Sequence, residues 1–366
     1  MKVALDIHTV GQRHTGNETY ISNLTDAMVR QKPGIEWLYY HFKGIELPSW
    51  PGEYRELSWK SPFVRIPWEI PRRLRADKPD VAHFQYVGPQ WSVCPFVVTV
   101  HDISFETDDD FFNRVDRLRM RTLVPWSIDR AAHVLTVSNF SKAEIVERYK
   151  VPEEKITVTY NGVDRVFSQP LSAQEADRVV EKLGLRRPFI LAVGNVQPRK
   201  NLVRLLQAFA NLHNSGQTED WSLYMVGQSR WGAEESYQQL QQLGLEKKAR
   251  FLGYVDSQAE LAALYKLADV FAYPSLYEGF GLPIVEAMAA GTPVLTSNVA
   301  SMPEVAGDAA VLVSPNSVDE IAEGLHALMT QQSLRQRLAE KGKQRARLFS
   351  WDEAARRTLS VYQSLV

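Results

Sequence analysis

Residues 272–291 read AYPSLYEGFGLPIVEAMAAG, which predicts a strand, a glycine-rich loop and a helix in that order. The apolar run at 269–275 favours a strand, and Pro283 suits the first helical turn, where its missing N–H is not needed. Gly291 is placed to end this helix, and residues 293–296 predict a further strand. Strands that alternate with helices in this way are typical of a parallel α/β sheet.

Two carboxylates flank the glycine-rich loop. Glu278 and Glu286 have seven residues between them. The start of the predicted helix adds unpaired N–H groups and a partial positive charge beyond the carboxyl end of the strand. These donors and acceptors together suit a ligand that carries both phosphate and hydroxyl groups. The segment therefore predicts a site for a sugar nucleotide.

Length and composition indicate a globular protein with two domains. The chain has 366 residues, of which 45% are hydrophobic, and its formal net charge is −1. This charge gives no general attraction to nucleic acid or to an anionic membrane. Cys94 is the one cysteine, so an intrachain disulfide is excluded and a reducing compartment is favoured. No apolar run approaches the ~18 residues of a membrane-spanning helix. The amino terminus shows no signal-peptide core, so we expect a cytoplasmic protein.

Strand-like runs alternate with helical patterns along the whole chain, which predicts parallel sheets in an α/β fold. The expected strands of the first half are 3–7, 81–86, 96–100, 133–137 and 156–160. Those of the second half are 189–194, 221–226, 250–252, 269–273, 293–296 and 310–313. The Asn161-Gly162 turn and Pro170 place a domain boundary near residue 168. We expect two Rossmann-like doubly wound domains, 1–168 and 169–350, that face a central cleft at the carboxyl ends of both sheets.

A second segment, FILAVGNVQPRKNLV at 189–203, also predicts a strand, a loop and a helix. The strand ends at Gly194, the loop supplies Arg199 and Lys200, and Asn201 is placed to cap the helix. Arginine offers a planar fork and lysine a point charge, so this pair beside a helix start predicts an anion site. The alternative is a solvated basic pair. The presence of residues 272–291 in the same domain favours the anion site.

The first half of the chain offers weaker candidates. Gly16 precedes a predicted helix and could let a ligand approach the backbone, with Arg13 of the same loop able to meet phosphate. His101 ends a strand at the expected cleft, where a substrate contact and a structural role are both open. The histidines lack the spacing of metal ligands, and Asp108–Asp110 resembles an exposed acidic turn, so no metal site is expected.

Two segments, 63–79 and 111–126, mix basic with aromatic residues. This composition suits contact with an anionic bilayer or with an anionic acceptor. The alternative is a pair of amphipathic helices whose aromatic faces pack inward. Nucleic acid is not expected, because no binding module accompanies the basic residues.

In its motifs the chain resembles the retaining glycosyltransferases of family four, which have two Rossmann-like domains (the GT-B type) and include many bacterial polysaccharide and glycolipid enzymes. The likeness runs over nearly the whole chain. Its most specific part is Glu278 to Glu286 with Gly-Phe-Gly-Leu-Pro at 279–283 between them. The other matching segments are 193–194 with 199–201, 137–141, and 160–164.

This resemblance implies roles for the donor-site residues. Arg199 and Lys200 would neutralise the leaving diphosphate, beside the phosphate segment that contains Gly194. Glu286 would accept hydrogen bonds from the ribose hydroxyls. Backbone groups around Val255 would seat the base.

The resemblance also implies how the sugar is held. The transferred sugar would contact the Glu278 side chain, His101 and three backbone amides, which are those of Phe280, Gly281 and Leu282. The Gly16 loop would lie over the phosphates, although members of the family often have Gly-Gly or Gly-Ile-Gly where this chain has Thr-Gly-Asn at 15–17. A carboxy-terminal helix at 351–366 would return to the first domain.

The function expected from these residues is that of a retaining hexosyltransferase. No residue stands out as a base-activated nucleophile beside the sugar site, which favours same-face substitution with the leaving diphosphate oxygen taking the acceptor's proton. Overall resemblance to mannosyltransferases of polysaccharide assembly favours GDP-mannose, while UDP-hexoses stay open. The acceptor would be a saccharide or a lipid-linked saccharide, with peripheral contact of 63–79 and 111–126 at the inner face of a membrane. Neither a cofactor nor an essential metal is expected.

Two other functions stay open. One is a nucleotide-sugar 2-epimerase on a similar scaffold, which would consume its donor with no acceptor present. The other is a catalytically silent subunit that binds a sugar nucleotide.

Overall fold

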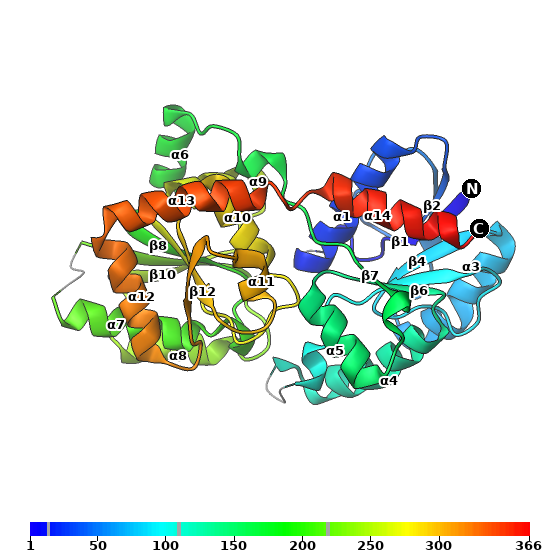
Figure 1. Cartoon of the computed structure of the whole chain (residues 1–366), viewed down its shortest axis with the longest axis horizontal. Coiled ribbons are helices and arrows are strands. Elements are labelled where there is room, and N and C mark those ends of the chain that lie inside the picture. The colour runs from blue at the N-terminus through cyan, green and yellow to red at the C-terminus, as the bar shows by residue number, and fades with distance from the viewer. Residues whose placement is uncertain (13–14, 108–110, 217–219) are drawn as a thin grey trace. The chain divides into compact units, whose positions relative to one another are not determined.

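The computed structural model describes residues 1–12, 15–107, 111–216 and 220–366, and it divides the chain into two compact units (Figure 1). Unit 1 comprises Met1–Glu106, Val115–Gly162 and Ser350–Val366. Unit 2 comprises Thr107–Arg114 and Val163–Phe349. Two features named above, Arg13 and the acidic run at 108–110, lie outside the described residues.

Unit 1 is built on a seven-stranded sheet with the order β3-β2-β1-β4-β5-β6-β7. Every neighbouring pair is parallel. The strands are β1 (Lys2–Asp6), β2 (Glu36–Phe42), β3 (Glu53–Leu57), β4 (Val81–Gln85), β5 (Phe96–Thr99), β6 (His133–Thr136) and β7 (Ile156–Val158). Central strands such as β4 and β5 are buried along their whole length, as expected for a parallel sheet with both faces covered.

The helices of unit 1 join these strands. They are α1 (Thr15–Gln31), α2 (Pro62–Val64), the π-helix η1 (Arg65–Glu69), α3 (Ile70–Asp77), η2 (Ser104–Glu106), α4 (Arg114–Arg130), α5 (Asn139–Tyr149), η4 (Glu153–Lys155) and α14 (Trp351–Ser364). The last helix, α14, packs against α1. Its Tyr362 hydroxyl lies 2.5 Å from Nδ1 of the buried His83, and Gly162 lies so close to Trp351 that a Cβ there would clash. These contacts hold the carboxy-terminal helix in unit 1.

Unit 2 is built on a six-stranded sheet with the order β10-β9-β8-β11-β12-β13. All its pairs are parallel as well. The strands are β8 (Phe189–Val193), β9 (Ser222–Val226), β10 (Ala249–Gly253), β11 (Val270–Tyr273), β12 (Val294–Ser297) and β13 (Ala310–Val313).

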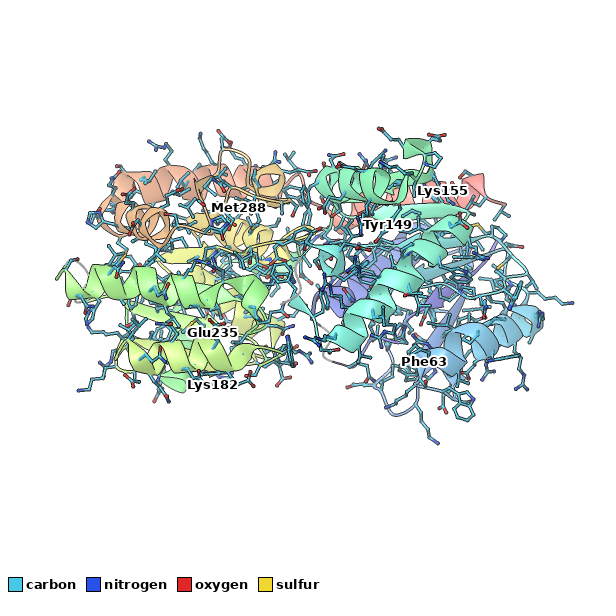
Figure 2. The ribbon with its side chains drawn as sticks, turned by 90° about the horizontal axis from the view of Figure 1, so that it is seen from below. Phe63, Tyr149, Lys155, Lys182, Glu235 and Met288 are labelled. Carbon is cyan, nitrogen blue, oxygen red and sulfur yellow. The ribbon has the colours of Figure 1, made fainter. Side chains whose placement is uncertain are left out.

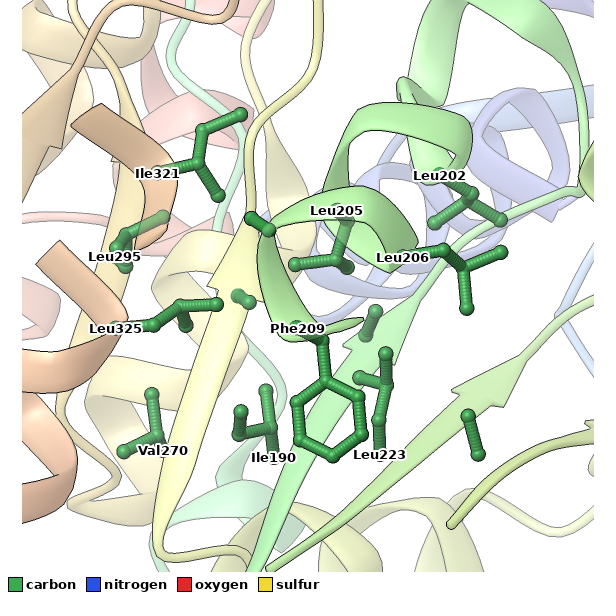
Figure 3. Close-up of a cluster of buried hydrophobic side chains, with 14 of the residues drawn as sticks. Ile190, Leu202, Leu205, Leu206, Phe209, Leu223, Val270, Leu295, Ile321 and Leu325 are labelled. Carbon is green, nitrogen blue, oxygen red and sulfur yellow. The ribbon is translucent and has the colours of Figure 1, made fainter. Parts of the chain in front are cut away.

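Helices cover the sheet of unit 2, and one face carries a continuous apolar core (Figures 1 and 3). The helices are η5 (Arg165–Phe167), α6 (Ala173–Leu183), η6 (Pro198–Lys200), α7 (Leu202–Asn214), α8 (Ala233–Gln242), α9 (Gln258–Leu267), α10 (Leu282–Ala290), α11 (Met302–Ala306), α12 (Val318–Thr330) and α13 (Gln332–Ala346). Helix α7 packs against α12, and α10 packs against α9 and α13. Leu205 and Phe209 of α7 are fully buried with Ile190 of β8 and Leu325 of α12. This core fixes α7, and therefore the loop before it, against the carboxyl end of β8.

All of the strands predicted from the sequence are present within one or two residues, and the expected α/β architecture of two parallel sheets is confirmed. Two strands were missed, β2 and β3. The aromatic run WLYYHF at 37–42 is buried and could have been recognised by its β propensity, whereas β3 is a short strand at the edge of the sheet. The change of unit comes at residues 162–163, before residue 168, because Phe167 packs edge-on against Tyr265 in unit 2.

None of the described helices is long and apolar enough to cross a membrane.

Candidate functional site

Two loops meet at the carboxyl edge of the unit 2 sheet. The loop after β8 ends in η6, which carries Arg199 and Lys200, while the loop after β11 carries Glu278. Because β8 and β11 are neighbouring parallel strands, both loops leave the same edge of the sheet. The Leu276 N–H donates to the Arg199 carbonyl at 2.9 Å and ties the two loops together.

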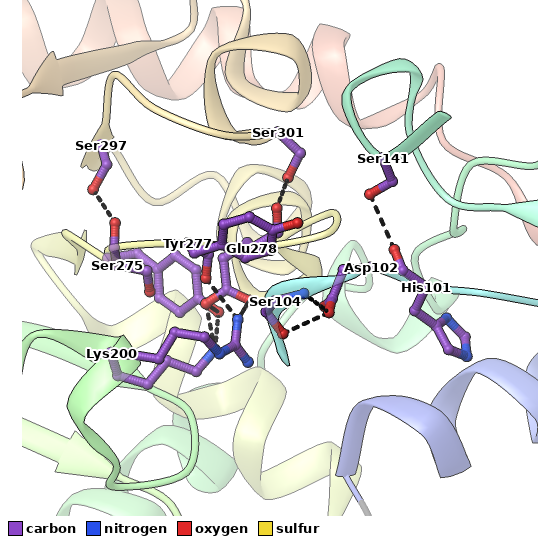
Figure 4. Close-up of polar contacts among 12 residues, drawn as sticks. His101, Asp102, Ser104, Ser141, Lys200, Ser275, Tyr277, Glu278, Ser297 and Ser301 are labelled. Carbon is purple, nitrogen blue, oxygen red and sulfur yellow. Dashed lines mark hydrogen bonds and ion pairs between the residues drawn. The ribbon is translucent and has the colours of Figure 1, made fainter. Parts of the chain in front are cut away.

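An ion cluster forms between these loops (Figure 4). Arg199 Nη1 lies 2.7 Å from Glu278 Oε2 and also donates to the Tyr277 carbonyl at 2.6 Å. Lys200 Nζ lies 2.6 Å from Glu278 Oε1. The Tyr273 hydroxyl donates to Glu278 Oε1 at 2.8 Å and accepts a hydrogen bond from Lys200. One carboxylate therefore organises two cations that are neighbours in sequence.

Burial makes this cluster electrostatically strong. The side chains of Arg199, Lys200 and Glu278 are 16%, 11% and 8% exposed. Desolvation opposes the charge on Glu278, but Arg199 and Lys200 outweigh it and hold the pKa of Glu278 at about 2. The carboxylate is thus ionised at neutral pH, and the three side chains together carry a net charge of +1. Such a buried, positive cluster can attract an anion.

A glycine allows Lys200 to reach this position. Gly194 follows β8 with φ +148°, and a Cβ on it would lie 3.1 Å from Lys200 Cε. The Gly194 carbonyl is in turn crowded by Gly227, where a Cβ would come within 1.9 Å of the oxygen. Both positions require close backbone approach, so glycine has a physical role at each of them.

The prediction that the Asn201 side chain caps α7 is wrong. Asn201 occupies the N-cap position but has the left-handed φ of 59° and makes no side-chain cap. Its Nδ2 instead donates to the carbonyls of Pro274 (2.9 Å) and Pro315 (2.7 Å). Asn201 therefore joins the loop after β8 to the loops after β11 and β13, and it satisfies one buried carbonyl in each of them.

The glycine loop leads directly into α10. Gly281 has φ 94° and occupies the N-cap position, and Pro283 lies in the first turn, as the sequence predicts. The helix ends at Ala290 with Gly291 in the left-handed conformation. Ser301 Oγ donates to the Glu278 carbonyl at 2.8 Å and holds the start of the loop (Figure 4). The amides of Phe280, Gly281 and Leu282 thus lie at a helix start, where N–H groups have no helical partner.

Glu286 lies one turn into α10 and is partly buried. Burial, and to a lesser extent the nearby Asp164, raises its pKa to about 7. The buried Tyr265 hydroxyl donates to Glu286 Oε2 at 2.8 Å and opposes this shift. Glu278 and Glu286 therefore differ in ionisation. Glu278 is ionised throughout the neutral range, whereas Glu286 titrates near neutral pH.

The loop that contains Val255 lies beside the loop after β9. The Gly227 N–H donates to the Gly253 carbonyl at 2.9 Å, and Val255 follows with its side chain partly buried. Both loops leave the carboxyl edge of the sheet that carries the ion cluster.

In unit 1, His101 follows β5 and is 8% exposed. Its Nε2 lies 2.9 Å from Gln85 Oε1, and its carbonyl accepts a hydrogen bond from Ser141 Oγ at 3.1 Å. Burial lowers the pKa of His101 to about 4, so the ring is neutral at pH 7. The neighbouring Asp102 accepts hydrogen bonds from Ser104 rather than from His101 (Figure 4).

Gly16 also belongs to unit 1, where it lies inside α1 and not before it. The prediction placed the helix start two residues too late, an error that is common at helix ends. Outside its own helix, no atom of the described residues lies within 4 Å of the position that a Cβ of Gly16 would take, and the residue is exposed.

Unit 2 thus brings together Arg199, Lys200, Glu278, Gly194 and the start of α10, with Glu286 and Val255 on the same unit. His101 and Gly16 belong to unit 1. Sequence reasoning missed Tyr273 and Tyr265, which hold the two carboxylates. The position of Tyr273 at the carboxyl end of β11 was the available signal.

Within the described ranges, no group of three or more histidine, cysteine, aspartate or glutamate side chains is placed to hold a metal ion.

Comparison with known proteins gives two matching family models. Residues 173–345 match the model of the glycosyl transferases group 1, and residues 14–167 match that of glycosyltransferase family 4. The chain is 35% identical over 302 residues to the O-antigen chain mannosyltransferase B of Escherichia coli, which covers 81% of this chain and 78% of that protein. It is 34% identical over 220 residues to the O-antigen chain mannosyltransferase RfbU of Salmonella typhimurium, with 60% and 56% covered.

Solved structures with the same fold extend over the full chain. Sucrose-phosphate synthase from Thermosynechococcus elongatus superposes with a TM-score of 0.79 at 22% identity and covers 100% of this chain and 99% of its own. Anabaena HepE in complex with UDP and glucose gives 0.78 at 20% identity, with 100% of both chains covered. At these identities the likeness shows the fold, and the expected GT-B type is confirmed.

Proposed function

The chain belongs to the glycosyltransferases of group 1 and family 4, and we propose that it transfers mannose from GDP-mannose to a saccharide or lipid-linked saccharide, with retention of the anomeric configuration. The mannosyl unit is supported by the two O-antigen mannosyltransferases to which the chain is similar. The ion cluster of unit 2 is the observation that carries the proposal.

The donor diphosphate would bind to Arg199 and Lys200. Both cations are buried and lie near the start of α10, so they offer charge and directed N–H groups in a region that excludes much of the water. The diphosphate carries more negative charge than the single carboxylate of Glu278. We therefore expect it to take over part of the hydrogen bonding that Arg199 and Lys200 now give to Glu278, which leaves Glu278 able to accept from hydroxyls of the sugar.

The remaining contacts follow along the same edge of the sheet. The amides of Phe280, Gly281 and Leu282 would donate to the sugar or its phosphate. Glu286 in its ionised form would accept from the ribose hydroxyls, and backbone groups around Val255 would hold the base. In this proposal unit 2 would bind the donor and unit 1 would bind the acceptor.

Retention would proceed by substitution on one face of the sugar. Glu278 is held by two cations and a tyrosine hydroxyl, which makes it a poor nucleophile. A leaving diphosphate oxygen would instead take the proton of the acceptor hydroxyl, and the cations would stabilise the charge that develops on it. The protein would contribute position and electrostatics, with no cofactor or essential metal.

In unit 1, His101 would contact the transferred sugar. Its ring is neutral at pH 7, so it would exchange hydrogen bonds with a hydroxyl and would not act as a general base. The exposed backbone at Gly16 would approach the phosphates. A lipid-linked acceptor would bring the enzyme to the inner face of a membrane.

Donor identity is tested by thermal unfolding with GDP-mannose and UDP-hexoses. A nucleotide sugar at 100 times its dissociation constant adds about 2.7 kcal/mol to the free energy of unfolding. We expect the largest rise in melting temperature with GDP-mannose, and a larger rise with a UDP-hexose would reject that donor. NMR of the product should show the anomeric configuration of the donor, whereas inversion would reject same-face substitution.

Incubation of the protein with donor alone separates the two other functions. A 2-epimerase would convert the donor without an acceptor, and a silent binding subunit would bind it without turnover. The proposed transferase consumes donor at a substantial rate only when an acceptor is added.

A further inference from the structure

Unit 1 carries a group of exposed aromatic side chains that the proposed reaction does not use. We call this group the aromatic face and define it as Trp59, Phe63, Trp68 and Trp91. Their exposed fractions are 55%, 70%, 74% and 64%. Single exposed apolar residues are common on protein surfaces, but several large aromatic rings on adjoining segments indicate an interaction site.

Three hydrogen bonds hold the three segments of the aromatic face together. The carboxylate of Glu69 accepts the N–H of Ser58 at 2.6 Å and that of Trp59 at 3.1 Å. The Gln90 N–H donates to the Ile66 carbonyl at 3.4 Å. The loops that carry Trp59 and Trp91 are thus held against the helical segment that carries Phe63 and Trp68 (Figure 2, in which Phe63 is labelled).

The helical segment has two apolar sides. Ile66, Ile70 and Leu74 are buried at a spacing of four residues and face the core. The segment includes the π-helix η1, in which the Ile70 N–H donates to the Arg65 carbonyl five residues earlier. Phe63 of α2 and Trp68 of η1 are both largely exposed and therefore lie on the outer side of the segment. The alternative, in which the aromatic residues of 63–79 pack inward, therefore does not hold for these two.

Within residues 58–78 the exposed charge is positive. Residues 58–78 contain six basic residues and two acidic ones, Glu69 and Asp77. Both acidic side chains are used internally, Glu69 by the backbone of 58–59 and Asp77 by Arg55 at 3.0 Å. The exposed cations are Lys60, Arg72, Arg75 and Lys78.

We infer that the aromatic face docks unit 1 on an anionic lipid bilayer. Tryptophan and phenylalanine flanked by lysine and arginine are the composition that places a protein in the interfacial region, with rings among the headgroups and cations on anionic lipids. Charge complementarity favours an anionic bilayer over a neutral one. The exposed cations of the segment stay positive overall, because its two acidic side chains make hydrogen bonds inside unit 1. The inference deepens the proposed function, since a lipid-linked acceptor is presented at such a surface.

Two arginines of the second basic segment are paired within the protein. In 111–126, Arg119 pairs with Asp116 at 2.8 Å and Arg121 pairs with Glu106 at 3.1 Å. These cations are neutralised within the protein, so the docking surface is the aromatic face and its four exposed cations.

Vesicle flotation tests the inference with the full chain and needs neither donor nor acceptor. Vesicles of phosphatidylcholine with about a third phosphatidylglycerol should carry the wild-type protein upward, and vesicles of pure phosphatidylcholine should not. The variant Arg72→Glu/Arg75→Glu should lower the partition coefficient by about 30-fold or more, because each surface cation contributes about a factor of five to binding. Trp59→Ser/Trp68→Ser should bind at least 10-fold more weakly.

The matched control is Trp231→Ser, which removes a tryptophan of unit 2 that is 61% exposed. It should float like the wild type. Equal flotation with neutral vesicles, no flotation of the wild type, or undiminished binding of Arg72→Glu/Arg75→Glu would overturn the inference. If the aromatic face binds a protein or a saccharide in place of the bilayer, the wild type should not float. Loss of mannosyl transfer with normal flotation would reject the proposed function alone.

Discussion

Glu286 should make donor binding depend on pH near neutrality. Burial and Asp164 raise its pKa to about 7, so about half of the carboxyl groups are protonated at pH 7. Hydrogen bonds from ribose hydroxyls are stronger to the ionised form than to the neutral one. The affinity for GDP should therefore increase as the pH rises through this pKa, because the ionised fraction increases.

Two substitutions should move this midpoint in opposite directions. Tyr265→Phe removes the 2.8 Å hydrogen bond to Glu286 Oε2 and keeps the ring between Phe167 and Phe271. A hydrogen bond to a charged group contributes about 1.5–3 kcal/mol, and 1.36 kcal/mol corresponds to one pKa unit. The midpoint should thus rise by about one unit or more. Asp164→Asn removes a repelling charge and should lower it, while its amide oxygen still caps the Val166 N–H that Asp164 now caps at 2.9 Å.

Isothermal titration calorimetry measures the GDP affinity at a series of pH values, from about two pH units below the pKa of Glu286 to about two pH units above it. The wild type should bind more tightly on the alkaline side, and the two variants should displace the curve to higher and lower pH respectively. An affinity that falls as the pH rises, or two variants displaced in the same direction, would refute the reasoning. Glu278 cannot produce this dependence, because its pKa of about 2 lies far below the range.

Three further perturbations test the ion cluster. Tyr273→Phe should lower kcat about 10-fold, because Glu278 and Lys200 lose a shared hydrogen-bond partner. The control is Tyr224→Phe, which should leave kcat unchanged, because the Tyr224 hydroxyl accepts the Arg186 N–H at the other end of β8. Gly194→Ala should destabilise the protein by about 1–3 kcal/mol in urea unfolding and weaken GDP binding, since φ +148° disfavours a side chain and Lys200 Cε lies 3.1 Å from the new Cβ. Chelation with EDTA should leave the transfer rate unchanged, and a loss restored by a divalent cation would contradict the metal-free mechanism.

The strands could be read from the sequence where local and tertiary signals agree. The runs at 189–193 and 270–273 are apolar and are buried except for the partly buried Val193, and they end at residues that turn the chain. Pro283 and Gly291 fixed the limits of α10 for reasons of backbone geometry alone. Strand β3 gave a weaker signal, because it lies at the edge of the sheet with one neighbouring strand and only Leu57 of its residues is buried.

Pairings across the fold could not be read in the same way. Arg199 and Lys200 each bind a carboxylate almost eighty residues away, and only the neighbouring positions of β8 and β11 bring them together. Asn201 was expected to cap a helix from local preference, but two carbonyls from distant loops compete successfully for its amide. The different environments of Glu278 and Glu286 likewise depend on Tyr273, Tyr265 and burial, which a local pattern does not contain.

Donor turnover by Arg199→Ala and Lys200→Ala tests the central claim most directly, since both cations are proposed to stabilise the leaving diphosphate. Loss of one such group costs about 100- to 1,000-fold in rate, and each variant should show this loss in kcat while it unfolds at nearly the wild-type temperature. Arg187→Ala, which removes an exposed arginine paired with Asp269 in the same unit, should retain the wild-type rate. Near-normal turnover by both folded variants would contradict the assignment of the ion cluster as the donor site.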